Sequence, residues 1–466
     1  MVFSSLLFLT LFLPFTLVLY YLLPERFKNG LLLLVSLVFY AWGEPTHIIL
    51  MLITTVYIWF LTMVMERCKE QGKIGISRIL MILCLVFSLG TLAYYKYFGF
   101  IVENLPFLQN LALEAPALPI GISFYTFQAL SYVIDVYRGD VKAQKSWVNF
   151  AMYISFFPQL IAGPIVRYSD VQNQLKNRKH SIKNCYHGTI RFTIGLGKKV
   201  LLANQIGKLW EEISGMSHLS TMGAWLGAVA FALQIYFDFS AYSDMAIGLG
   251  RMFGFHFPEN FRYPYQSKSI TEFWRRWHIT LGTWFREYVY IPLGGNRKGK
   301  VRLVLNLFVV WSLTGLWHGA AWQFLFWGVY YFLFLTIEKF FLLRWMEKWP
   351  SFLQHIYTLL VVVVGWVMFA CPNFGTAWNF YKAMLGIGVP FADHAALFYL
   401  AGNVLLLVIL FLGATELPKR FVRAIRHSMK PAHFEWLAYA TAILLLWGSV
   451  AFLVADSYNP FLYFRF

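Results

Sequence analysis

The sequence predicts an all-α polytopic membrane protein. Three features of the 466 residues support this fold class: 59% are hydrophobic, only 13% are Asp, Glu, Lys or Arg, and the mean hydropathy is +0.57. Soluble domains carry about 25% charged residues. The composition therefore excludes an ordinary soluble enzyme, a disordered chain and a disulfide scaffold.

The few charges are strongly unbalanced, with 39 Lys and Arg against 22 Asp and Glu and a net charge of +17. In membrane proteins, excess Lys and Arg collect in cytoplasmic loops. We therefore expect the lipid bilayer, and no nucleic acid, to be the partner of this positive charge. The four cysteines form no CxxC pair, so the sequence indicates neither a zinc site nor a disulfide framework.

Apolar runs of membrane-spanning length recur along the chain. The first, Phe3 to Leu23, has neither the basic start nor the small-residue cleavage site of a signal peptide, so we expect a retained transmembrane helix kinked at Pro14. Together the runs predict about 10–12 transmembrane helices in one domain over residues 1–466. The later runs fall at about 31–42, 47–65, 76–98, 118–137, 147–166, 222–250, 303–322, 323–343, 353–371, 397–415 and 436–455.

The run 147–166 conflicts with a simple count of spans, because basic loops flank it on both sides. The positive-inside rule would place both loops in the cytoplasm, although a single span must change sides. Pro158, Gly163 and Pro164 interrupt this run. We expect a broken or re-entrant helix, which is tolerated at membrane depth only inside protein or beside a cavity.

The stretch 255–302 carries nine Lys or Arg residues and three Glu residues. Its apolar residues recur at helical spacing, and Ser269 with Glu272 fits a capping box at the start of the helix. We expect one basic amphipathic helix on the cytoplasmic side of the membrane interface. The apolar face consists of Phe273, Trp277, Leu281, Trp284 and Tyr288.

Two histidines differ from the others, most of which lie in polar loops. His278 lies in the amphipathic helix, in WRRWHITL, and His318 lies among almost entirely apolar neighbours, in GLWHGAAW. An ionisable residue within a membrane span is costly and indicates function. A general base is the simplest role for His318, because an imidazole titrates near neutral pH. A structural histidine, a zinc site and haem ligation are the alternatives. Asp238 and Asp244 stand in another apolar run, where they either catalyse or hold helices together by hydrogen bonds.

Four segments in order resemble the membrane-bound O-acyltransferases, in the bacterial branch that includes the alginate O-acetylation and teichoic-acid D-alanylation membrane proteins. They are PQLIAGPIVRY, DFSAYSDMAIGLGRMFGFHFPENF, EFWRRWHITLGTWFREYVYIPLGGNR and GLWHGAAW, and the resemblance covers about residues 120–330. It implies a catalytic His318, a supporting His278, and transmembrane helices that ring shorter ones around a central tunnel. Gly282 departs from the family's common Ser, and Tyr330 to Phe332 replace a frequent second His-Gly.

The resemblance also implies an activity in the inner membrane of a bacterium. An acyl group, with acetyl favoured and acetyl-CoA as its donor, would pass across the membrane to an exported polysaccharide through an extracytoplasmic, membrane-anchored SGNH-type transferase. No metal is implied. The phosphates of the donor would favour the basic region around Arg275, Arg276, Arg297 and Lys298, although such arginines are also common as interfacial charges.

The aromatic tail at 457–466 contains Tyr463, in DSYNPFLYFRF. One interpretation is an aromatic anchor at the membrane interface. The resemblance implies another, in which Tyr463 is an acyl carrier, because a related aromatic-Tyr motif has that role in the family. A phenol has a pKa near 10, so its ester is more activated than a sugar ester.

Two other functions remain open on the sequence. Broken helices with polar residues are also typical of a transporter or channel, although no inverted repeat is evident. An acyltransferase of the same fold could instead act on a lipid or a protein.

Overall fold

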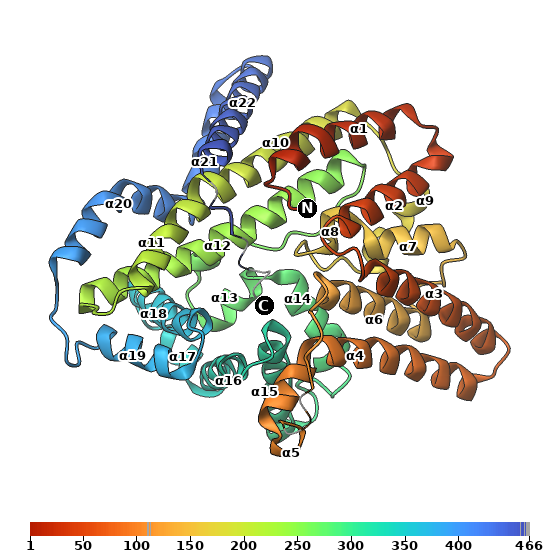
Figure 1. Cartoon of the computed structure of the whole chain (residues 1–466), viewed down its shortest axis with the longest axis horizontal. Helices are drawn as coiled ribbons and strands as arrows, with labels where there is room; N and C mark the ends of the chain where they lie inside the picture. Colours follow the sequence, from red (N-terminus) through yellow and green to blue (C-terminus); the bar gives the residue numbers. More distant parts are fainter. Residues whose placement is uncertain (110, 112, 457, 461, 463–466) are drawn as a thin grey trace. The chain divides into compact units, whose positions relative to one another are not determined.

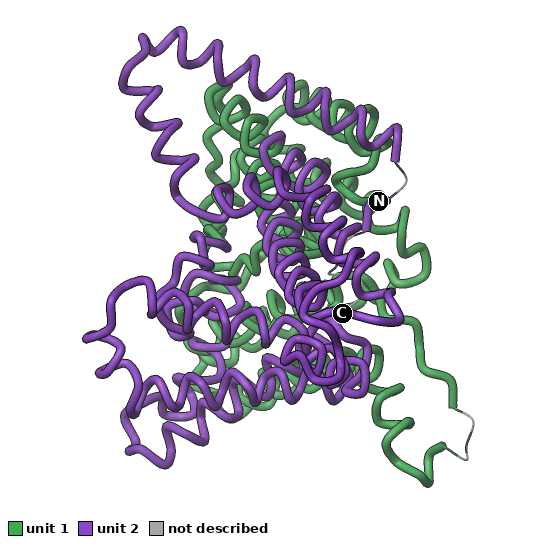
Figure 2. Tube along the Cα trace, turned by 90° about the vertical axis from the view of Figure 1, so that its left-hand side faces the viewer, with its two compact units in different colours: residues 1–192, 243–259 green, residues 193–242, 260–466 purple. Residues whose placement is uncertain are grey.

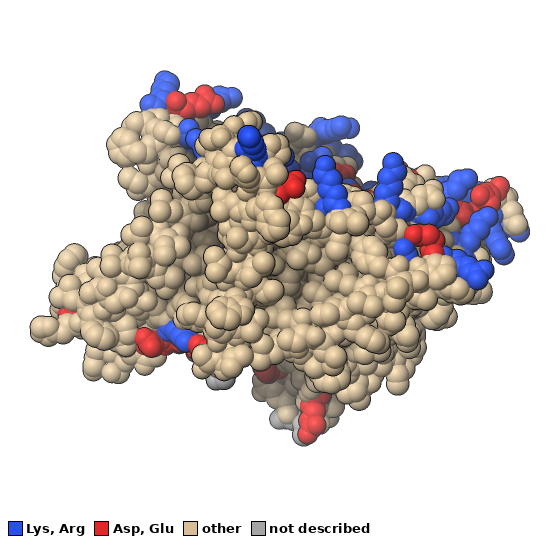
Figure 3. All heavy atoms as spheres, turned by 90° about the horizontal axis from the view of Figure 1, so that it is seen from above, with Lys and Arg blue, Asp and Glu red and all other residues tan. Residues whose placement is uncertain are grey.

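The computed structural model describes residues 1–466 except 110, 112, 457, 461 and 463–466. Every regular element in the described residues is a helix. Among these residues, eight helices are long and apolar enough to cross a membrane, and the apolar stretch Phe8–Leu22 is shorter. This confirms the predicted all-α polytopic fold. In the view of Figure 3, most of the surface carries no Lys, Arg, Asp or Glu.

The chain divides into two compact units, residues 1–192 with 243–259 and residues 193–242 with 260–466 (Figure 2). In unit 1, α3 and α4 form an antiparallel hairpin that packs against α6, and α2 packs against α7 (Figure 1). The helices of unit 1 are η1 Phe8–Phe12, α1 Leu13–Leu22, α2 Glu25–Ala41, α3 Ile48–Glu70, α4 Ile74–Asn104, α5 Pro106–Gln109, α6 Ile122–Arg138, α7 Trp147–Ser155, α8 Phe157–Leu160 and α9 Tyr168–Lys176.

The predicted interruption in residues 147–166 is confirmed. The chain leaves α7 at Phe156, re-enters a short α8 with Pro158 in its first turn, and is non-helical from 164 to 167. Gly163 allows this bend, because a Cβ there would lie 2.6 Å from the Cα of Gln159. Residues 150–166 are all buried, so this irregular backbone is enclosed by protein.

In unit 2, α15 and α16 form a hairpin in which the backbones touch. A Cβ on Gly315 would overlap the carbonyl oxygen of Phe324, and a Cβ on Gly328 would overlap that of Trp311. Small residues permit such close approach between membrane helices. This contact fixes the last turn of α15, where His318 stands. α18 packs against α16, and α13 contacts both of these helices.

Two helices, α10 Ile182–Gly197 and α12 Thr221–Met252, contain residues of both units. The remaining helices belong to unit 2. They are η2 Lys198–Ala203, α11 Asn204–Ser214, η3 Pro264–Gln266, α13 Ile270–Arg276, α14 Ile279–Phe285, η4 Arg286–Tyr290, α15 Gly299–His318, α16 Trp322–Ile337, η5 Glu338–Leu342, α17 Leu343–Met346, α18 Ser351–Ala370, α19 Phe374–Met384, α20 His394–Gly413, α21 Leu417–Ser428 and α22 Pro431–Ala455.

Candidate active site

His318 is the last residue of α15 and is 5% exposed. Aromatic rings surround its imidazole: the ring centroids of Trp317, Trp327 and Phe369 lie 4.9, 5.1 and 5.3 Å away. Each ring is steeply inclined to the imidazole, between 77° and 82°, which is the edge-to-face geometry that aromatic pairs favour. These contacts hold the imidazole in one orientation.

His278 lies between α13 and α14 with φ 44°, a left-handed backbone that is uncommon outside glycine. Its Nδ1 is 3.1 Å from Oδ1 of Asn260. The backbone N–H and the hydroxyl of Thr280 also donate to that oxygen. A backbone N–H can only donate, so the Asn260 atom is an oxygen and Nδ1 of His278 carries the proton. The lone pair of the neutral imidazole is therefore on Nε2.

Trp317 brings the two histidines into one cluster. Its ring centroid is 5.8 Å from that of His278 and 4.9 Å from that of His318. His278 also contacts Phe239 of α12, whose ring centroid is 4.8 Å from that of the imidazole. The structure thus places both predicted histidines, 40 positions apart in sequence, in the same buried aromatic core of unit 2.

The prediction of one continuous amphipathic helix around His278 is wrong. α13 ends at Arg276, Trp277 is extended, and α14 begins at Ile279. The five residues of the predicted apolar face are nevertheless buried, at 0–8% exposure, so this face packs inside protein rather than on a lipid surface. The apolar residues keep their helical spacing across the break because both short helices bury the same side.

Two acceptors fix the start of α13. Ser269 caps the helix by accepting from the N–H of Glu272, as predicted, although the Glu272 carboxylate bonds the N–H of Lys268 instead of completing the box. Glu338 of η5 is fully buried and accepts from the N–H groups of Ile270 and Thr271. These contacts anchor the segment that carries His278.

The four basic residues predicted to meet the donor differ in environment. Arg276 pairs with Glu272 at 2.6 Å within its own helix. Arg275, Arg297 and Lys298 are exposed. The structure therefore leaves three cations accessible, and their role toward a donor stays a prediction. Within the described residues, no three His, Cys, Asp or Glu side chains come together as metal ligands.

The model of the membrane-bound O-acyltransferase family matches residues 36–376, a range that includes both histidines. The chain belongs to this family. It is 41% identical to a probable alginate O-acetylase of Pseudomonas putida, over 100% of this chain and 100% of that protein. It is 31% identical to a peptidoglycan O-acetyltransferase of Helicobacter pylori, over 100% of this chain and 98% of that protein. A teichoic acid D-alanyltransferase of Bacillus subtilis is 29% identical over 55% of this chain and 67% of its own length.

Family membership makes the chain an O-acyltransferase and a multi-pass membrane protein. The resemblance stated from the motifs is confirmed. The assignment of His318, His278, Tyr463 and the basic residues as functional stays a prediction, as does a tunnel that reaches His318.

A buried ion pair lies in the same unit of this acyltransferase. Lys199 of η2 and Asp238 of α12 are 2.7 Å apart, and their side chains are 4% and 3% exposed. Asp238 also accepts from the N–H of Leu462, 3.0 Å away, so it holds elements together, one of the two roles expected for it. Asp244, in unit 1, pairs with Arg191 at 2.8 Å.

The described part of the C-terminal tail runs along this ion pair. Asp456 pairs with Lys208, the carbonyl of Tyr458 accepts from the Asn204 amide, and Lys199 donates to the carbonyl of Pro460. The hydrogen bond from Lys208 holds the pKa of Asp456 below its usual value. Tyr463 lies outside the described residues, one position beyond Leu462.

Breaking the ion pair should loosen the tail and destabilise the fold. Lys199→Met leaves the carboxylate of Asp238 buried without its cation, which typically costs about 3–5 kcal/mol. The double variant Lys199→Met/Asp238→Asn removes both charges and keeps an acceptor for Leu462, so we expect it to be more stable than the single variant. Thermal unfolding of the purified chain in detergent measures both. A single variant as stable as the original chain would contradict a coupled pair.

Sequence reasoning missed Asn260, Trp317, Lys199 and Glu338. Trp317 adjoins His318 and so carried a visible signal, whereas Lys199 stands at the end of a basic cluster, next to Lys198 and directly before the apolar residues VLLA. Asn260 carried none, because its partner His278 is 18 positions away and only the fold joins them.

Proposed function

We propose that this enzyme transfers an acetyl group from acetyl-CoA across the bacterial inner membrane for O-acetylation of an exported or cell-surface polysaccharide. His318 is the general base, His278 supports it, and Tyr463 relays the acetyl group. The observation that carries the proposal is the pair of buried imidazoles around Trp317, in a chain that belongs to the O-acyltransferase family.

The comparisons favour acetyl over D-alanyl as the transferred group. The O-acetylases of Pseudomonas and Helicobacter match this chain along its entire length, whereas the D-alanyltransferase of Bacillus subtilis matches 55% of it. The names of the matching O-acetylases include alginate and peptidoglycan, two glycans with free hydroxyl groups. We therefore infer a glycan acceptor.

The chemistry takes two balanced transfers. His318 removes the proton from the phenol of Tyr463, whose oxygen attacks the thioester carbonyl, and the C–S bond breaks to release the CoA thiolate. The imidazolium returns this proton to the thiolate, so that CoA leaves as the thiol. Neutral His318 then removes the proton of a hydroxyl on the acceptor side, whose oxygen attacks the tyrosyl ester, and the imidazolium gives that proton to the departing phenolate. Such covalent catalysis divides one difficult step into two easier ones. His278 contributes a hydrogen-bond acceptor at Nε2, fixed by Asn260.

The donor would meet the exposed cations Arg275, Arg297 and Lys298, which attract its phosphates, with Arg276 held by Glu272 beside them in sequence. A membrane-anchored SGNH-type transferase would receive the acetyl group outside and pass it to the polymer. The basic ends of the helices would face the cytoplasm.

Reconstitution tests the reaction class. The full chain in lipid vesicles is mixed with acetyl-CoA that carries a labelled acetyl group, together with polymer and the SGNH-type partner. We expect release of free CoA and labelled acetyl on the polymer. A transporter would instead move a solute without consuming the thioester. No CoA release in the complete mixture, from a chain that remains folded, would contradict the proposal.

A further inference from the structure

Unit 1 contains a pocket of about 620 Å³ at the polar ends of α2, α7 and α9. This volume lies within the range of about 300–1,000 Å³ that is typical of sites for small molecules. Three cations and one carboxylate are among its lining residues: Arg26, Lys176, Arg178 and Glu25. The carboxylate is already engaged, because Glu25 binds Lys28 at 2.8 Å and His180 at 3.0 Å.

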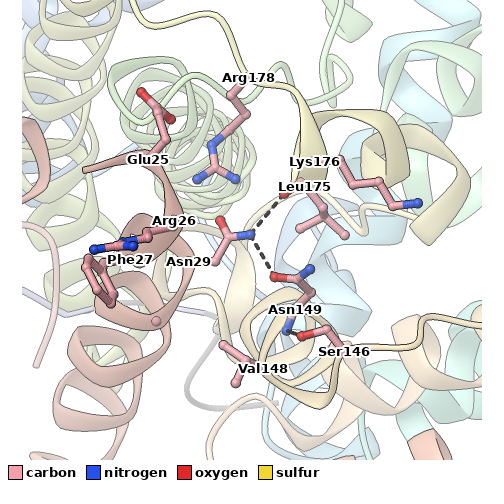
Figure 4. A pocket seen from close by; sticks show the side chains of 11 residues that line it. Glu25, Arg26, Phe27, Asn29, Ser146, Val148, Asn149, Leu175, Lys176 and Arg178 are labelled. Atoms are coloured by element: carbon pink, nitrogen blue, oxygen red, sulfur yellow. Dashed lines mark hydrogen bonds between the residues drawn. The ribbon is translucent and has the colours of Figure 1, made fainter. Parts of the chain in front are cut away.

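The floor of the pocket is held in place by side-chain amides. The Asn29 amide nitrogen donates to Oδ1 of Asn149, 2.7 Å away, and to the carbonyl of Leu175, 2.9 Å away (Figure 4). These bonds join α2, α7 and the end of α9. Because Oδ1 of Asn149 accepts from Asn29, the Asn149 amide nitrogen is a donor on the pocket wall.

Arg178 is positioned before any ligand arrives. Its Nε donates to the hydroxyl of Tyr20 at 3.2 Å, its Nη1 donates to the carbonyl of Gln174, and the guanidinium stacks 4.4 Å from the ring of Phe255. Figure 4 shows the guanidinium turned into the space between Glu25 and Asn29. Arg26 and Lys176 extend to opposite sides of the pocket in the same view. A fixed guanidinium between two exposed cations suits a phosphate group.

The apolar surface beside the pocket indicates how deep in the membrane the pocket lies. Leu11, Phe15, Val18 and Leu22 are 58–76% exposed and recur at helical spacing, which forms a lipid-facing stripe. That stripe ends at Leu22, three positions before Glu25. The pocket therefore lies at the level of lipid headgroups.

The charges at the two ends of unit 1 indicate which leaflet of the membrane the pocket faces. The end that holds the pocket also holds Lys69, which bonds the carbonyl of Tyr137 at the end of α6. The opposite ends of α2 and α4 carry acidic residues: Glu44 follows α2, Glu103 is in the last turn of α4, and Glu114 follows α4. The positive-inside rule places the basic end in the cytoplasm, where anionic lipids are available.

We propose that this pocket binds the phosphate of an anionic phospholipid headgroup in the cytoplasmic leaflet. The phosphate oxygens accept from the guanidinium of Arg178 and the amide of Asn149, and Arg26 and Lys176 close over the headgroup from either side. A soluble phosphate presents the same anionic oxygens as the lipid headgroup, so it is the alternative ligand for this pocket.

The test titrates the full chain in detergent with short-chain phosphatidylglycerol, short-chain phosphatidylcholine and inorganic phosphate, followed by native mass spectrometry. We expect phosphatidylglycerol to bind at least about tenfold more tightly than phosphatidylcholine, since each basic side chain near an anionic lipid contributes about fivefold. The double variant Arg26→Gln/Lys176→Gln should lose this preference.

The matched control is Lys73→Gln/Lys142→Gln, which removes the same charge from exposed positions in the same unit that do not line the pocket. It should bind as the original chain does. Arg178→Lys keeps the charge but loses the planar fork, so we expect weaker binding with unchanged net charge. An equal loss in the Lys73/Lys142 control, or equal binding of the two lipids, would overturn the site. If inorganic phosphate fully displaced phosphatidylglycerol, the ligand would be a soluble phosphate and the proposal of a lipid would be overturned.

Discussion

Replacing His318 by glutamine should lower acetyl transfer to the polymer by about a thousandfold, within the range of about 10²–10⁴ that a positioned general base contributes. Glutamine keeps a polar side chain of similar length between Trp317, Trp327 and Phe369, but it cannot take up a proton at neutral pH. The smaller change to alanine would open a cavity among these rings and confuse lost packing with lost catalysis. The measurement is the acetyl content of the polymer made by cells that depend on this chain.

His394→Gln is the matched control for this variant. His394 is exposed at the start of α20, so the same substitution there removes an imidazole without touching the aromatic cluster. It should leave acetylation unchanged. If His318→Gln unfolds at the same temperature as the original chain and still acetylates the polymer, the general base lies elsewhere. Nε2 of His278 would then be the next candidate.

The fold class follows from composition because a bilayer permits few architectures. A chain with little charge and long apolar runs must pair its backbone N–H and C=O groups with one another, and helices do this within each run. The interruption near Pro158 was visible for the same local reason, since proline cannot continue a helix. The break at His278 was not visible. A left-handed residue there depends on Asn260, and apolar spacing continued across it.

His318 stood out because it interrupts an apolar segment, and His278 because it stands in an amphipathic one, whereas the residues that orient them did not stand out. Asn260 and Trp317 act through contacts that exist only once distant segments meet. The Lys199–Asp238 pair shows an intermediate case. Asp238 was a visible charge in an apolar run and Lys199 belonged to a basic cluster, but the sequence did not indicate that they face one another or that the tail crosses them.

Replacing Tyr463 by phenylalanine should abolish polymer acetylation and also prevent acetyl from appearing on the chain itself. The change removes only the phenolic oxygen that would carry the acetyl group, so we expect a loss of at least about a hundredfold if relay is obligatory. Intact-mass measurement after incubation with acetyl-CoA reports the acetylated chain, and polymer analysis reports the second transfer. Tyr458→Phe makes the identical change five positions earlier in the same tail and should affect neither.

The tail contacts make this comparison informative. The carbonyls of Tyr458 and Pro460 accept from Asn204 and Lys199, and the N–H of Leu462 donates to Asp238. Three described tail residues before Tyr463 are therefore held by their backbone groups. The loss of one hydroxyl at position 463 leaves all of those bonds in place. If Tyr463→Phe still acetylated the polymer, the acetyl group would pass from the thioester directly to an acceptor hydroxyl, and the bound tail would be a structural anchor. The base role of His318 would survive that result, because deprotonating a hydroxyl is required on either route.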